Sequence, residues 1–158
     1  MNYPEFSDEY FMNIAIQEAR KAFNNDEVPI GAIVVMENKI IARAYNQTEL
    51  LNDVTAHAEI LAITSAEQNI GAKYLLNATM FVTVEPCVMC IGAIFWSKIS
   101  RLVFGASDEK FGHRKIQKYI ENTDTSMYHP KMEVKGGVLA EESRSLMKQF
   151  FINKRNLN

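Results

Sequence analysis

Cysteine is scarce in this sequence: there are two, and both lie within one C-x-x-C motif, at Cys87 and Cys90. A disulfide framework that joins distant parts of the chain is therefore excluded. Two thiols at this spacing suit either a metal ion or a redox-active dithiol of the thioredoxin type. The surrounding sequence has to decide between these two kinds of site.

Long apolar runs are also missing, since stretches such as residues 30–36 are far too short to span a bilayer. Residues 1–5 lack the basic region and apolar run of a signal peptide. We therefore expect a cytoplasmic protein with no membrane association. Low-complexity tracts, internal repeats and linker-like stretches are absent as well, so residues 1–158 are expected to form a single domain.

The chain has no strong excess of charge of one sign, because its net charge at pH 7 is −2. The distribution along the chain is uneven. Residues 1–97 carry 5 Lys and Arg against 12 Asp and Glu, a balance of −7, whereas residues 98–158 carry 12 against 7, a balance of +5. A basic C-terminal third indicates an anionic partner, although a solvated basic face without a partner fits the same charges.

Hydrophobic periodicity predicts helices and strands in alternation. Helices are expected from residue 8, capped by Ser7, to residue 24, and over residues 55–68, 86–97 and 141–156, with a further helical part at 115–121. Strands are expected over residues 30–36, 40–45, 79–84, 101–106 and 131–134. This order predicts an α/β fold with three layers, α/β/α. Its five-stranded sheet is mixed and mostly parallel, with an antiparallel hairpin at one side.

Two short motifs carry the chemistry. Residues 55–59, Thr-Ala-His-Ala-Glu, hold His57 and Glu59, and residues 85–90, Glu-Pro-Cys-Val-Met-Cys, hold both cysteines. Each motif lies at the expected start of a helix, where ligands collect in sheets of this kind. One imidazole and two thiolates can bind zinc and leave a fourth position open for water, while Glu59 carries protons without binding the metal. The pattern is the H-x-E…P-C-x-x-C signature of nucleobase deaminases.

Local geometry shapes these expectations. With Pro86 as the first helical residue, Cys87 and Cys90 share one face at a helix N-terminus, where the dipole favours thiolates. In a helix that starts at Thr55, His57 and Glu59 would project about 200° apart. We therefore expect this helix to point at the zinc end-on, so that both side chains reach it.

Other interpretations remain open. A dithiol redox protein would leave His57 and Glu59 without a role and would be isolated without zinc. A structural zinc would result if His113 or His129 filled the fourth position. In that case a non-catalytic RNA-binding protein is possible, in which Glu59→Ala would be harmless.

The wider sequence resembles a known family. Residues 28–32, Asn46, the two motifs, Gly92-Ala93 and residues 103–106 match the pattern of the bacterial tRNA-specific adenosine deaminases, in the cytidine/deoxycytidylate deaminase superfamily. The resemblance extends over residues 8–155. It implies a cytidine-deaminase-like fold, a homodimer, and one Zn²⁺ per subunit on His57, Cys87 and Cys90, with Glu59 as proton shuttle. The implied reaction converts the wobble adenosine of tRNA to inosine and releases ammonia.

The same resemblance implies contacts with the substrate. Asn46 is expected to hydrogen-bond the nucleoside, and Asp108 to lie where the family meets the anticodon stem-loop. Lys110, Phe150 and Arg155 are expected to contact RNA. Simpler roles are possible: a turn residue for Asn46, a surface acid for Asp108, and core packing for at least one ring of the Phe150–Phe151 pair.

The chain departs from the family pattern at two places. Val54 stands where a proline is usual, and an insert over residues 111–128 replaces a short loop after Lys110. This region carries Lys110, Phe111, Arg114, Lys115, Lys118 and Tyr119. Such residues can bind phosphates and stack on bases, or they can form a lid over a smaller substrate. The alternative function is therefore deamination of a free base or nucleoside, such as guanine or cytosine.

Overall fold

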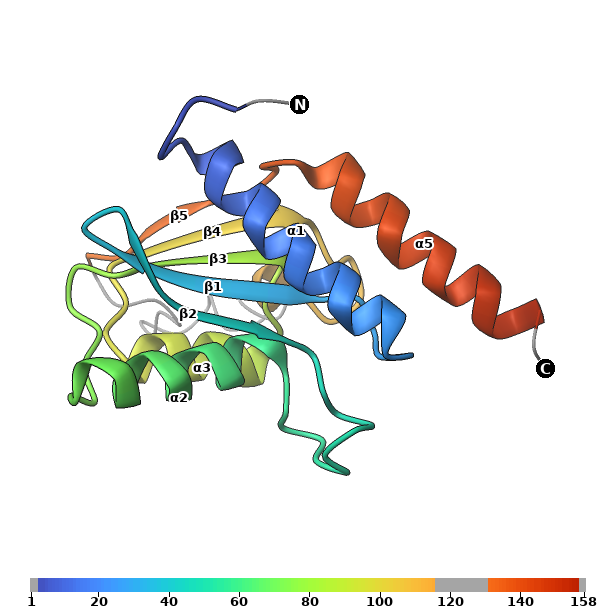
Figure 1. Ribbon diagram of the computed structural model, residues 1–158, viewed down its shortest axis with the longest axis horizontal. Helices are drawn as coiled ribbons and strands as arrows, with labels where there is room; N and C mark the ends of the chain where they lie inside the picture. The colour runs from blue at the N-terminus through green and yellow to red at the C-terminus, as the bar shows by residue number, and fades with distance from the viewer. Residues whose placement is uncertain (1–2, 116–130, 157–158) are drawn as a thin grey trace.

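The computed structural model describes residues 3–115 and 131–156. Its elements are α1 (Asp8–Asn24), β1 (Gly31–Met36), β2 (Lys39–Tyr45), α2 (Ala58–Ile70), β3 (Thr79–Val84), α3 (Val88–Trp96), β4 (Arg101–Ala106), β5 (Glu133–Lys135) and α5 (Ala140–Asn156) (Figure 1). These follow the predicted order. The helix expected over residues 115–121 lies outside the described residues except for Lys115, which is helical. None of the helices in the two described ranges combines the length and apolar character that a bilayer crossing needs.

The five strands form one sheet in the order β2-β1-β3-β4-β5. β1 pairs antiparallel with β2 on one side and with β3 on the other, whereas β3, β4 and β5 are parallel. β1 therefore runs against the other strands, and its hairpin with β2 forms one side of the sheet. The prediction of a mixed, mostly parallel five-stranded sheet with an antiparallel hairpin is confirmed.

Helices cover both faces of the sheet, α1 and α5 on one and α2 and α3 on the other (Figure 1). Successive residues of β1 supply the two cores, because side chains alternate between the faces of a strand. Ala32 and Val34 belong to the core under α2 and α3, and Ile33 and Val35 to the core under α1. This alternation between two apolar layers explains the continuous apolar run of this strand, and it gives the predicted three-layer architecture.

One glycine allows the first helix to lie directly on the sheet. A Cβ atom at Gly31 would lie 2.1 Å from the carbonyl oxygen of Ala15 and 2.4 Å from the backbone nitrogen of Ala19. No other residue type fits without moving α1. The Gly31 N–H also donates to Oγ1 of Thr83 on β3 at 3.1 Å.

The sequence predicted β3 and β4 with their observed bounds, and Ser7 caps α1 as expected by accepting the Tyr10 N–H. The predicted starts of two helices were wrong. Thr55 does not cap α2, because its N–H and hydroxyl both donate to Oδ1 of Asp53. Pro86 is not helical, because α3 begins at Val88. In both cases the helix starts one residue after a predicted metal ligand.

Candidate active site

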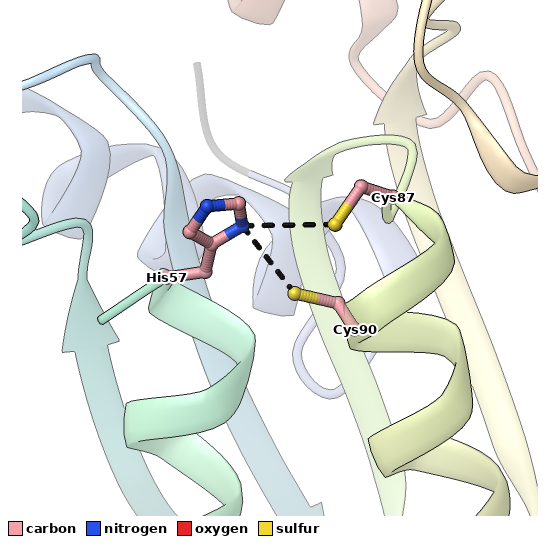
Figure 2. Close-up of side chains that lie close together, drawn as sticks. All are labelled: His57, Cys87 and Cys90. Atoms are coloured by element: carbon pink, nitrogen blue, oxygen red, sulfur yellow. Dashed lines mark hydrogen bonds between the residues drawn. The ribbon is translucent and has the colours of Figure 1, made fainter. Parts of the chain in front are cut away.

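The two motifs meet in space (Figure 2). His57 is the N-cap of α2, Cys87 is the N-cap of α3, and Cys90 is the third residue of α3. Nδ1 of His57 lies 3.7 Å from Sγ of Cys87 and 3.5 Å from Sγ of Cys90. The ligand atoms of all three side chains lie within 4.8 Å of one another. The convergence expected from the helix starts is therefore present.

These separations fit a zinc ion. Bonds of about 2.1 Å to nitrogen and about 2.3 Å to sulfur in a tetrahedron place the two ligand atoms about 3.6 Å apart. The two nitrogen–sulfur distances lie on either side of that value. Within the described part of the chain, His113 does not join the group. Its Nδ1 instead bonds the carbonyl oxygen of Pro86 at 3.0 Å, and His129 lies outside the described residues.

The pKa values of the two thiols are shifted in opposite directions. A hydrogen bond from Cys90, opposed by burial and assisted by His57, lowers the pKa of Cys87 to about 4. The interaction with Cys87, together with burial, raises the pKa of Cys90. The hydrogen bond with Cys87 also raises the pKa of His57. One cysteine is thus a ready thiolate at neutral pH, which is the form that binds a metal.

Glu59 lies in the first turn of α2, and its side chain is buried. Its Oε2 atom has no hydrogen-bond partner among the described residues. Burial raises the pKa of Glu59 to about 7. The angle of about 200° expected between His57 and Glu59 in a regular helix does not apply, because His57 precedes the helix in an extended conformation with ψ 151°. Glu59 interacts with Cys87, His57 and Cys90, so its side chain and that of His57 reach the same space at the N-terminal end of α2.

Asn46 is buried, and an unpredicted residue holds it. Its Nδ2 donates to Oε2 of Glu27 at 3.2 Å and lies 3.3 Å from Oγ1 of Thr48. Glu27 is itself completely buried, and its carboxylate also accepts the backbone N–H groups of Glu49 and Leu50. A carboxylate only accepts hydrogen bonds, so it fixes the Asn46 amide with Nδ2 toward Glu27. The sequence offered one signal for this role, an acidic residue directly before the Val-Pro-Ile-Gly stretch.

Asp108 lies in the turn that follows β4. Its Oδ1 accepts the backbone N–H groups of Lys110 and Phe111, and its own N–H donates to Oε2 of Glu85. The side chain therefore shapes this loop as an Asx turn. It remains half-buried at the surface.

The expected RNA-contact residues divide into two groups. Lys110 and Arg155 line one hollow of about 440 Å³ with Phe151 and Lys154, which we call the basic rim. Phe150 is only 6% exposed and packs against Phe23, with ring centroids 5.9 Å apart. Phe151 is 46% exposed. The ring available to a partner is thus Phe151, and Phe150 has the core role that was left open for one of the pair.

A second hollow joins the rim to the Asn46 loop. Glu49 and Leu50, whose N–H groups bond Glu27, line it together with Phe151 and Lys154. Of the insert, Arg114 bonds Glu85, and Lys115 bonds the carbonyl oxygen of Glu109. Lys118 and Tyr119 lie outside the described residues.

The fold and site define a class of protein. A family model described as MafB19-like deaminase matches residues 6–156. The tRNA-specific adenosine deaminase of Agrobacterium fabrum is 42% identical over 146 residues, which cover 92% of this chain and 95% of that protein. The chain belongs to the family of tRNA-specific adenosine deaminases, which confirms the resemblance seen in the sequence.

Solved structures agree with this assignment. One comes from a study of A-to-I editing by tRNA:A34 deaminases at the wobble position of transfer RNA. It matches with a TM-score of 0.79 and 41% identity, covering 87% of this chain and 98% of that one. The guanine deaminase of Bacillus subtilis matches with a TM-score of 0.63 and 33% identity, covering 75% and 76%. Related deaminases with different substrates thus share this fold.

Proposed function

We propose that this protein hydrolytically deaminates the wobble adenosine of tRNA, consuming water and releasing inosine-containing tRNA and ammonia. The observation that carries the proposal is its identity of 42% to a tRNA-specific adenosine deaminase over nearly the whole length of both chains. The protein acts as one domain in the cytoplasm, where its tRNA substrate is found.

His57, Cys87 and Cys90 hold one Zn²⁺ per subunit in this proposal. The support is their nitrogen–sulfur geometry and their mixed N and S chemistry, which suit a catalytic zinc with three protein ligands. When bound, such an ion lowers the pKa of a coordinated water toward about 7.

Glu59 moves the protons. Its Oε2, which has no hydrogen-bond partner among the described residues, lies in a buried site in the first turn of α2, which follows the N-cap His57. This atom takes a proton from the attacking water and returns protons to the ring nitrogen and to the departing amine. The balance is one water consumed and one ammonia released, so Glu59 ends the cycle as it began.

Asn46 and Asp108 bind the substrate near the reacting base. The Asn46 amide is held by Glu27 and therefore meets the nucleoside in one orientation. The anticodon stem-loop then lies on the basic rim, with Lys110 and Arg155 on phosphates and Phe151 available for stacking. The positive balance of residues 98–158 fits an RNA partner.

The functional unit is a homodimer in this proposal. The face formed by α2 and α3 exposes large apolar side chains, with Trp96 at 75% and Val88 at 46%. Ile60, Ile63 and Ala93 line a hollow of about 550 Å³ beside Trp96. Exposed apolar surface of this kind is typical of a subunit interface. Light scattering of the purified protein measures the assembly directly.

The decisive experiment compares substrates. The zinc-loaded protein is incubated with an anticodon stem-loop that carries the wobble adenosine, and separately with free guanine, cytosine and adenosine. Nucleoside analysis should detect inosine in the stem-loop, with slow or no ammonia release from the free bases. Fast guanine turnover without inosine would instead support the free-base alternative, to which the guanine deaminase relative points.

A further inference from the structure

Glu85, which directly precedes Pro86, is the centre of a hydrogen-bond cluster that does not include the metal ligands. The side chain of Glu85 is 2% exposed. Its Oε1 accepts the Arg114 backbone N–H at 3.1 Å and the Arg114 Nε–H at 3.0 Å. Its Oε2 accepts the Arg114 Nη2–H at 2.9 Å and the Asp108 N–H at 3.2 Å. The carboxylate thus ties one segment, residues 108–114, to the chain entering α3.

The next two residues are tied to the same segment. The Pro86 carbonyl oxygen accepts the backbone N–H of His113 at 3.0 Å and lies 3.0 Å from its Nδ1. Cys87 forms a β-bridge with Gly112. Residues 85, 86 and 87 are therefore each held by a different residue of segment 108–114, and the last of them is a proposed metal ligand.

Close packing leaves this segment little freedom. A Cβ atom at Gly112 would lie 2.5 Å from the Asp108 carbonyl oxygen and 2.6 Å from Cδ of Glu85. The Arg114 guanidinium lies 4.8 Å from the centre of the Phe104 ring and also donates to Oγ of Ser107 at 2.9 Å. Arg114 is therefore engaged with the protein itself, in contrast to the phosphate contact that its position in the insert suggested.

We propose that Arg114 and His113, through Glu85 and Pro86, are positioning residues that hold the metal ligand Cys87 in place. Cys87 precedes α3 in an extended conformation and makes no capping hydrogen bond, so its own helix does not fix its side chain. Residues that orient a metal ligand typically change metal affinity by about 10–100-fold when removed. This inference rests on the metal site in the proposed function and extends it to the insert.

The arrangement has a consequence for the substrate side. The same carboxylate that binds Arg114 also accepts the N–H of Asp108, a proposed substrate residue. The metal ligand and the loop that meets RNA therefore form one rigid unit. A change in Arg114 alters both, whereas a change in the α5 side chains of the basic rim, such as Arg155, alters RNA binding alone.

The test measures zinc affinity rather than turnover. Competition with a chromogenic chelator gives the zinc Kd, and Co²⁺ substitution reports the thiolate ligands through charge-transfer absorption. Arg114→Ala should raise the zinc Kd roughly tenfold. Arg114→Lys should give a zinc Kd between those of Arg114→Ala and the unmodified protein, because a lysine cannot form the bidentate contact with Glu85. Arg144→Ala is the matched control, since Arg144 is exposed on α5 and pairs with Glu141. Its zinc Kd should equal that of the unmodified protein.

A double-mutant cycle identifies the contact. Glu85→Gln keeps the shape of Glu85 and should weaken zinc binding as Arg114→Ala does, and the double variant should be little worse than either single one. An unchanged zinc Kd in both single variants overturns the proposal. So does zinc loss that merely follows unfolding of the metal-free protein, measured by circular dichroism. Weakened zinc binding in a protein that never forms inosine would support the positioning role and refute the proposed substrate.

Discussion

The proposed metal centre and the basic rim are built in opposite ways. His57, Cys87 and Cys90 lie at two helix starts, and the sheet and its connecting loops fix where those helices begin. The rim combines a loop residue, Lys110, with side chains near the end of α5. The first region is set by the core of the fold, and the second by surface side chains that are only partly held.

This difference separates chemistry from substrate choice. Solved structures of a tRNA:A34 deaminase and of a guanine deaminase both match this fold, so the fold alone does not set the substrate. Changes at the centre should therefore abolish turnover on every substrate. Changes at the rim should act only on RNA, and they should leave the zinc in place.

Loss of the metal should have the largest effect. Cys90 is completely buried, and Cys90→Ala removes one of the three proposed ligands, so zinc content should fall and inosine formation should stop. Removing zinc from the unmodified protein with a chelator should give the same loss, and added Zn²⁺ should restore activity only there. Metal analysis alongside the inosine assay checks both. Full activity in a metal-free sample would contradict the proposal that turnover depends on the metal centre.

Glu59→Gln should come next. The amide keeps the size of the buried side chain but cannot shuttle protons, so kcat should fall by about 10²–10⁴-fold. Zinc content should stay at one per subunit, because Glu59 is not among the proposed ligands. Single-turnover inosine formation and metal analysis on the same sample provide the measurement. A variant that loses zinc as well would make Glu59 part of the metal site.

The two phenylalanines of α5 should sharpen the contrast within the rim. Phe151→Ala should weaken stem-loop binding by about 1–3 kcal/mol if its ring stacks on a base, with little change in stability. Phe150→Ala should instead cost about 3–5 kcal/mol of unfolding free energy, because its ring is buried against Phe23. Equal losses of stability from both phenylalanine variants would contradict the assignment of Phe150 to the core and Phe151 to the rim.

Arg155→Ala should reduce the salt dependence of RNA binding by about one unit of slope. Lys148→Ala is its control, because Lys148 lies on the exposed side of α5.

The smallest effect is expected at the other end of the sheet, where β4 begins. Arg101 there forms an ion pair with Asp8, and this contact, with help from Lys135, lowers the pKa of Asp8 from 3.8 to about 2. A depressed pKa stabilises the fold above about pH 4, and the contribution disappears as the pH falls through about 2. Asp8→Asn should cost about 1 kcal/mol or less at pH 7 and flatten the acid limb of stability. Thermal unfolding across pH 2–7 measures this, and turnover at pH 7 should not change.

Much of the centre could be predicted because it follows from local rules. Strand patterns gave the bounds of β3 and β4, and helix starts next to strand ends brought His57 to the two cysteines. Short-range competition for hydrogen bonds explains the errors at the helix starts. The Asp53 carboxylate binds Thr55 before it can cap, and the bridge to Gly112 keeps Cys87 extended.

The supporting residues could not be predicted, because their roles depend on contacts between distant segments. The sequence alone suggests that Glu27 is a surface acid, whereas in the structure it bonds Asn46 and the loop that follows. The sequence alone suggests that Arg114 binds phosphate, whereas in the structure it bonds Glu85. Which of Phe150 and Phe151 faces inward depends on where α5 lies against α1, and helical spacing in that segment does not fix it.

The N-cap positions of α2 and α3 have a consequence for engineering. The side chains of His57 and Cys87 make no capping hydrogen bond with the helices that follow them. A serine at either position would stabilise its helix by about 1 kcal/mol, and it would remove a proposed metal ligand. The protein thus trades helix stability for its reaction twice. A library selected for thermostability alone should drift toward serine at both positions, and its most robust members would be inert.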